Sequence, residues 1–127
     1  MKNSIKLFSI LITYLCFQSY CYSQNNSLIS KADEAFKSGN YTKAVKYYSE
    51  SINKTNNINY VFYMRAYSYF NIKKYEESKN DIKKALKISK KSPDYNWLKS
   101  SSYWLYSSII TKESGINKKS LKYLKKA

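Results

Sequence analysis

The 127-residue sequence contains no histidine and has only 2 glycines, 1 proline and 2 cysteines. Without histidine, the chain lacks the usual general base near neutral pH, the Ser-His-Asp triad and most catalytic zinc sites. So little glycine and proline argues against an all-β fold, which needs many tight turns, and against glycine-rich phosphate loops. Acidic residues are also scarce, with 8 against 23 Lys and Arg, for a formal net charge of +15. The composition therefore indicates a basic, helical domain.

Tyrosine, in contrast, is abundant. The chain has 15 tyrosines, and aromatic residues make up 17% of it. That is too much ring surface for a disordered chain, and the length suits one small domain. We find no serine beside a base, no carboxylates paired on one face and no metal-ligand spacing. We therefore expect no enzymatic activity, no cofactor and no metal.

Residues 1–23 have the pattern of a secretory signal peptide. Lys2 and Lys6 precede an apolar run over 7–17, which is too short to span a bilayer, and Ser23 offers a small residue for cleavage. We expect cleavage after Ser23 and export to the periplasm or exterior of a bacterium. An uncleaved anchor and a buried first helix of a cytosolic protein are the alternatives. Cleavage would remove both cysteines, Cys16 and Cys21.

The remainder of the chain repeats with a period of 34 residues. The segment 39–44 aligns with 73–78 at an offset of 34, and a third copy follows the second at an offset of 42. Each copy has small residues at three equivalent positions. These positions are Ala32, Ala44 and Ser51; Ala66, Ser78 and Ala85; and Ser108, Ser120 and Ala127. Small side chains at fixed spacing allow two helices to cross closely.

This pattern resembles the tetratricopeptide-repeat (TPR) family, whose unit is two antiparallel helices of 34 residues in total. The resemblance implies an all-α, right-handed helix-turn-helix solenoid over residues 24–127, with units at about 25–58, 59–92 and 93–127. We expect helices at about 28–38, 41–54, 59–71, 75–91, 93–113 and 117–127, with the eight extra residues at the start of the fifth helix. The third unit stops at repeat position 27. We interpret this as a truncated frame or as an open edge that docks on a partner.

The resemblance also implies a concave groove lined by the first helix of each unit. The residues expected there are Tyr60, Tyr63, Tyr67, Phe70 and Asn71 in the middle unit, Ile29 and Asp33 in the first, and Leu105 and Ile109 in the third. Tyrosine buries much surface at little entropic cost and keeps a polar group, which favours it at binding sites. We predict a peptide-binding groove with an aromatic centre. The alternative is that some of these rings, Phe70 above all, belong to the core between helices.

The leading functional hypothesis is a non-catalytic module that binds a peptide or helix of a partner protein in this groove. One alternative is the N-terminal repeat array of a longer sensory or regulatory envelope protein. Another is a basic surface that binds anionic envelope polymers. Nearly all the positive charge is lysine, with Arg65 the only arginine, and phosphate readers prefer arginine. We therefore expect a solvated basic face with weak contacts to anionic surfaces, and no nucleic-acid partner.

Overall fold

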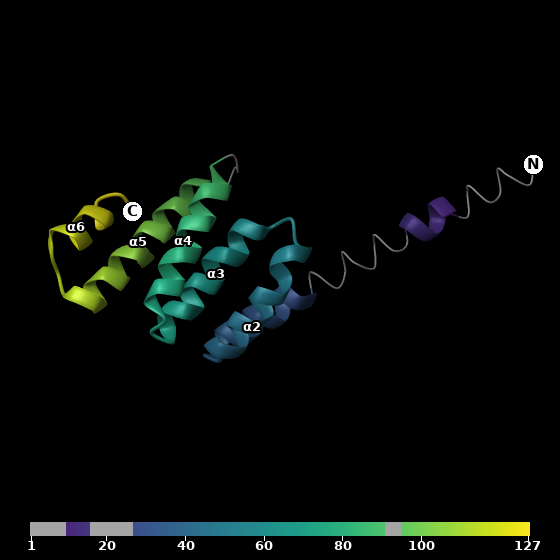
Figure 1. Cartoon of the computed structure of the whole chain (residues 1–127), viewed down its shortest axis with the longest axis horizontal. Helices are drawn as coiled ribbons and strands as arrows, with labels where there is room; N and C mark the ends of the chain where they lie inside the picture. Colours follow the sequence, from purple (N-terminus) through teal and green to yellow (C-terminus); the bar gives the residue numbers. More distant parts are fainter. Residues whose placement is uncertain (1–9, 16–26, 91–94) are drawn as a thin grey trace, which may run out of the picture.

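The computed structural model describes residues 10–15, 27–90 and 95–127 (Figure 1). Residues 10–15 and 27–37 are helical, and the labelled elements follow. They are α2 (Tyr41–Ser51), the short 3-10 helix η1 (Ile52–Lys54), α3 (Ile58–Asn71), α4 (Tyr75–Ser89), α5 (Tyr95–Ser114) and α6 (Lys118–Leu124). No strand occurs in these ranges.

The helices pack in consecutive pairs. Helix α3 packs against both α2 and α4, and α5 packs against both α4 and α6 (Figure 1). This confirms the predicted all-α, TPR-like solenoid. The four helices expected between 28 and 91 occur within two residues of their predicted ends, if η1 is counted as the last turn of the second helix, and α5 ends one residue after the predicted 113.

Some predictions lie outside the described residues, and one is wrong. The expected cleavage after Ser23 and the helix start at 92–94 lie outside the described residues. No helix among the described residues is long and apolar enough to cross a membrane. The last helix ends at Leu124 and not at 127, so Ala127 lies beyond α6 and is exposed, and its predicted place at a helix crossing is wrong.

The turn inside each unit has one residue with positive φ. These are Gly39 at 77°, Lys73 at 62° and Gly115 at 72°. In the first unit the turn N–H groups of Gly39 and Asn40 donate to carbonyls at the end of the preceding helix. This left-handed ending satisfies helix carbonyls that would otherwise lack a partner, and it favours glycine. The next helix then begins at once, because the Asn40 side chain accepts a hydrogen bond from the Lys43 N–H.

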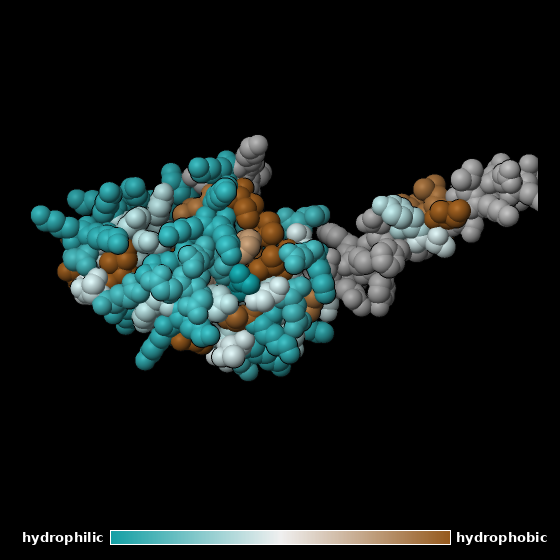
Figure 2. All heavy atoms as spheres, viewed as in Figure 1, coloured by the Kyte–Doolittle hydropathy of each residue, from teal (hydrophilic) through white to brown (hydrophobic). Residues whose placement is uncertain are grey.

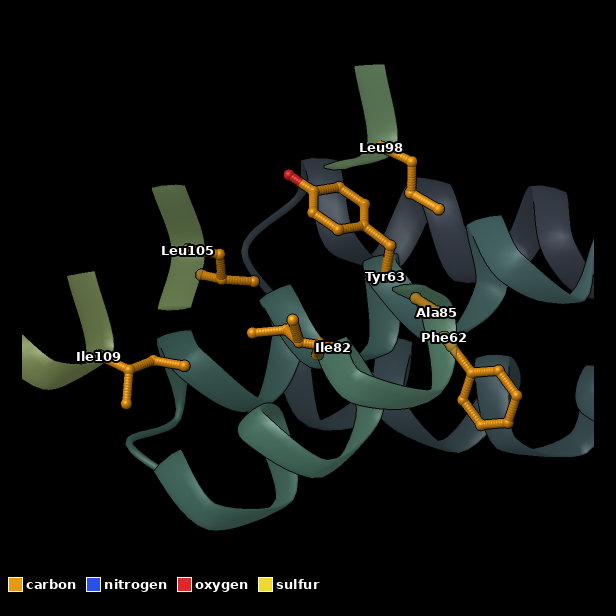
Figure 3. Packing of buried hydrophobic residues seen from close by; sticks show 8 residues of the cluster. Phe62, Tyr63, Ile82, Ala85, Leu98, Leu105 and Ile109 are labelled. Atoms are coloured by element: carbon orange, nitrogen blue, oxygen red, sulfur yellow. The ribbon is translucent and has the colours of Figure 1, made fainter. Parts of the chain in front are cut away.

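Two clusters of buried side chains hold the pairs together. The first lies between the 27–37 helix, α2 and α3, and consists of Ala32, Ala35, Ala44, Tyr48 and Val61. The second lies between α3, α4 and α5 and is drawn in Figure 3. Its members are Phe62, Tyr63, Ala66, Ile82, Ala85, Leu98, Leu105 and Ile109. The small residues predicted at crossings in the first two units are all fully buried. At one of them the Ser78 hydroxyl donates to the Ala66 carbonyl at 2.7 Å.

The third unit has a different register from the one predicted. Ser108 is half-buried, and its hydroxyl bonds the Trp104 carbonyl of its own helix. The residue at the crossing is Ser107, which is 1% exposed and donates to the Ser120 carbonyl at 2.8 Å. Helix α5 therefore follows α3 at an offset of 41, whereas Gly115 and Ser120 keep the offset of 42. One of the eight extra residues lies between Ser107 and Gly115, and not at the start of α5.

Candidate binding surface

The change of register moves two predicted groove residues into the core. Leu105 and Ile109 are both 0% exposed, and their side chains point toward Ile82 of α4 (Figure 3). At an offset of 41 they follow Met64 and Ser68, which do not belong to the predicted groove positions of the middle unit. Their assignment to the groove is therefore wrong.

Tyr63 also belongs mainly to the core. It is 6% exposed and is a member of the cluster that includes Leu105. Burial raises the pKa of its hydroxyl, and a hydrogen bond with Ser101 opposes part of that rise. Its ring still reaches the surface layer, because it meets the Trp97 ring edge-on at 5.4 Å between centroids.

Asp33 and Tyr60 join three helices to one another. One carboxylate oxygen of Asp33 accepts hydrogen bonds from the hydroxyls of Tyr48 in α2 and Tyr60 in α3, the second at 3.0 Å. Burial, followed by the charge of Asp33 and its hydrogen bond, raises the pKa of Tyr60 to about 12. The same causes raise the pKa of the fully buried Tyr48. Both predicted groove residues thus have a structural partner.

The other predicted residues stay nearer the surface. Ile29, Tyr67 and Phe70 are half-buried. Asn71 is exposed, and its amide donates to the Tyr67 carbonyl one turn earlier. The rings of Tyr67 and Phe70 lie 6.3 Å apart, and both are partly exposed at the border between core and solvent.

A row of aromatic rings connects the first helices of the three units. Phe36 lies 5.2 Å from Tyr67, and Tyr67 lies 6.3 Å from Trp104. Trp97, which stands on Tyr63, adds a fourth ring at the start of α5. Trp97 is 56% exposed and Trp104 is 46% exposed. We call Phe36, Tyr67, Trp97 and Trp104 the aromatic row.

The two tryptophans are the site residues that the sequence analysis missed. At an offset of 41, Trp104 takes the repeat position of Tyr63, and the signal for this was the small residue Ser107 beside Ser108. Trp97 lies in the added first part of α5 and has no counterpart in the other units. Repeat comparison therefore gave no indication of its role.

A small pocket with both polar and apolar lining residues borders the row. Its volume is about 110 Å³, and it is lined by Asn57, Asn59, Tyr60, Trp97 and Leu98. Two asparagine side chains thus stand beside one exposed indole ring. Aromatic faces with amide groups at their border suit the side chains and backbone of a peptide. Within the described ranges, no group of three His, Cys, Asp or Glu side chains could hold a metal ion.

The face of the domain that Figure 2 shows is largely hydrophilic, with hydrophobic residues gathered in its upper middle and singly elsewhere. Lysines dominate the second half of the domain: residues 82–127 contain twelve lysines and two acidic residues. One of the two, Glu113 of α5, accepts a hydrogen bond from the Lys79 Nζ of α4 at 3.1 Å.

Two comparisons with known proteins agree with this architecture. Residues 26–53 and 60–92 match the family model described as Tetratricopeptide repeat. The chain is also similar to human Tetratricopeptide repeat protein 12, with 35% identity over 66 residues. That match covers 52% of this chain and 9% of the human protein.

Proposed function

Because the chain belongs to the tetratricopeptide-repeat family, we propose that it is a non-catalytic interaction module that binds a segment of a partner protein along the aromatic row. The observation that carries the proposal is the pair of tryptophans of α5, Trp97 and Trp104, which stay about half exposed, whereas Phe62 and Tyr63 of α3 are buried. Partly exposed aromatic side chains in a packed surround are where interface energy concentrates.

The geometry of the row favours an extended or helical segment over a small molecule. The row crosses the 27–37 helix, α3 and α5, so a bound chain would contact all three units. The ring edges accept apolar side chains, and the asparagines beside Trp97 can bond the backbone of the segment.

Intrinsic fluorescence offers a direct test, because Trp97 and Trp104 are the only tryptophans of the chain. Peptides are selected from a random displayed library against the full chain and titrated into it. The proposal predicts a saturable shift of tryptophan emission. Selected peptides that bind without changing the emission would place the binding site elsewhere and contradict it.

Binding of anionic envelope polymers by the lysine-rich surface is a second candidate, favoured by the charge of residues 82–127. Surface electrostatics of this kind weaken strongly with salt. A polyanion such as polyglutamate should then bind at low ionic strength and dissociate at high ionic strength, whereas the peptide on the aromatic row should stay bound.

Two further proposals concern secretion of the chain and its place in a longer protein. We propose that residues 1–23 are removed on secretion to the bacterial periplasm or exterior, which intact-mass measurement of protein from the periplasm would test. Recovery of the uncleaved chain from the cytoplasm alone would contradict export. In a longer envelope protein with sensory or regulatory domains, the same row would act as its recognition surface.

A further inference from the structure

A second pocket lies between α4, α5 and α6, on residues separate from the aromatic row. Its volume is about 280 Å³. The lining residues are Ile82, Lys83, Leu86, Tyr103, Tyr106, Tyr123 and Lys126. The pocket thus combines an aliphatic floor, three tyrosine rings and two lysines.

The tyrosines form a packed wall with a lysine against it. The rings of Tyr106 and Tyr123 lie 4.6 Å apart, and those of Tyr103 and Tyr123 lie 6.1 Å apart. The Lys126 Nζ stands 5.7 Å from the Tyr103 ring centre and 5.9 Å from that of Tyr123. A lysine held at this distance over aromatic faces keeps its charge at the mouth of the pocket.

The equivalent place in the preceding unit is filled by the chain itself. There, Asp81 of α4 accepts two hydrogen bonds from Arg65 of α3, at 2.6 and 2.9 Å. Lys84 lies 3.9 Å from the same carboxylate and 5.4 Å from the Phe62 ring. The Asp81 side chain is 3% exposed, so one carboxylate occupies the place between two cations and a ring.

The offsets of 41 and 42 relate the two places residue by residue. Phe62, Arg65, Asp81 and Lys84 correspond to Tyr103, Tyr106, Tyr123 and Lys126. The third unit thus keeps the ring and the lysine over it, but has a tyrosine where the carboxylate was.

The lysines of this pocket form no ion pair with a described carboxylate, and Glu76, which is near enough to Lys83 to feel its charge, is paired with Lys79. Among the described residues, neither Lys83 nor Lys126 has a carboxylate within ion-pair distance. The nearest acidic residues in sequence are already engaged, Asp81 by Arg65 and Glu113 by Lys79. The local field therefore attracts a negative group from outside the domain.

We propose that this pocket binds an acidic side chain, Asp or Glu, of a partner protein, with a neighbouring apolar residue of that segment against the tyrosine rings. The pocket has lysines and no arginine, so a single carboxylate would meet two point charges and not a bidentate fork. The apolar floor of the pocket suits a peptide with an apolar side chain better than a fully charged polymer. The chain's own occupant in the preceding unit is also an aspartate.

The probe is the blocked peptide acetyl-Leu-Glu-Leu-Glu-Leu-amide, titrated into the full chain and followed through the ring signals of Tyr103 and Tyr123 by NMR. We expect saturable shifts with this peptide and none with the version in which Gln replaces Glu. Lys83→Gln with Lys126→Gln should lower the affinity about tenfold, as loss of two partly screened charge contacts predicts. Equal binding of the Gln peptide would overturn the proposal.

A matched pair of lysines controls for diffuse charge. Lys87 of α4 and Lys122 of α6 are exposed and do not line the pocket. Their double Gln variant has the same net charge as the pocket variant and should bind the peptide nearly as well as the parent chain. An equal loss in both variants would mean attraction to the basic surface as a whole. Displacement of the peptide by equimolar inorganic phosphate would mean a general anion site; either result overturns the proposal.

A second variant closes the pocket without removing its lysines. Tyr106→Arg with Tyr123→Asp rebuilds the ion pair of the preceding unit and should abolish binding of the probe. If this variant folds and still binds the peptide fully, the proposal is wrong. If it does not fold, the comparison of the Lys83/Lys126 variant with the Lys87/Lys122 variant decides. Trp97→Ala with Trp104→Ala should leave the binding unchanged, which separates this pocket from the aromatic row.

Discussion

At the scale of single residues, the fold depends on a few side chains with unusual surroundings. Lys73 has the left-handed backbone that the other two units give to glycine. Tyr48 and Tyr60 share one oxygen of Asp33. Each of these positions yields a measurable consequence.

Replacing Lys73 with glycine should stabilise the domain. A residue with a side chain destabilises the fold by about 1–2 kcal/mol at this φ. Glycine removes that strain, but it also raises the entropy of the unfolded chain, which offsets part of the gain. We expect a gain of roughly 0.5–1 kcal/mol in the free energy of unfolding, measured by urea denaturation. The control is Lys74→Gly, where φ is −85° and no gain is expected. A loss of stability in Lys73→Gly would show that the lysine side chain matters more than the backbone.

The Asp33 network should make the domain sensitive to alkali. The pKa of Tyr60 is about 12 in the fold against an ordinary value of 10.0. Below pH 10 the hydroxyl is protonated in both states, so its contribution to stability is complete. Above pH 10 the unfolded chain loses this proton first, so the free energy of unfolding falls as the pH rises toward 12.

Tyr60→Phe should therefore flatten the decline of stability with pH over this window. Urea denaturation at a series of pH values measures it, and the titration of lysines is common to both proteins. Parallel curves for Tyr60→Phe and the parent chain would mean that Asp33 does not hold the tyrosine proton.

At the scale of helices, the sequence predicted the structure correctly wherever the repeats could be aligned in only one register. Gly39 and Asn40 marked one helix end and the next start, and Ala66 with Ser78 marked a crossing. Helix α5 could be aligned with α3 in two registers. Ser107 and Ser108 are both small, and Ile109 and Ile110 are both apolar, so offsets of 41 and 42 fit the pattern equally well. Packing against α4 and α6 distinguishes them, and the predicted groove residues of the third unit depended on that choice.

The register of α5 can be tested by overpacking. Ser107→Leu places a large side chain at the crossing with α6 and should cost about 1–3 kcal/mol. Position 108 is half-buried, so Ser108→Leu should change the free energy of unfolding by roughly 0.5 kcal/mol or less. Thermal denaturation of the two variants compares them directly. The reverse order of stability would restore the offset of 42.

The ion pair of Arg65 and Asp81 holds α3 to α4, and the Arg65 Nη1 also donates to Ser49 of α2 at 2.9 Å. Asp81→Ala leaves a largely buried guanidinium without its carboxylate and should cost about 3 kcal/mol or more. Arg65→Met with Asp81→Leu should recover much of this loss, because both charges are then removed. Urea denaturation measures both variants. A small effect in Asp81→Ala would mean that water or Ser49 satisfies Arg65 instead.

At the scale of the whole molecule, the repeats place two different surfaces on one small domain. The first helices of the units present the aromatic row, and the pocket that contains Lys83 and Lys126 lies between the second helices α4 and α6, next to α5. The solenoid itself follows from the 34-residue period and its small residues. The exposed tryptophans do not, because one depends on a single-residue shift and the other lies in an insertion without a repeat counterpart.

Binding of a partner segment on Trp97 and Trp104 is tested most directly by the affinity of a selected peptide for the double variant Trp97→Ala, Trp104→Ala. Isothermal titration calorimetry compares it with the parent chain and with Ile88→Ala, which removes an exposed side chain from α4. We predict a loss of about 2 kcal/mol or more in the double variant, an unchanged affinity in Ile88→Ala, and the same helical circular dichroism in all three. An unchanged affinity in a folded double variant would contradict the account.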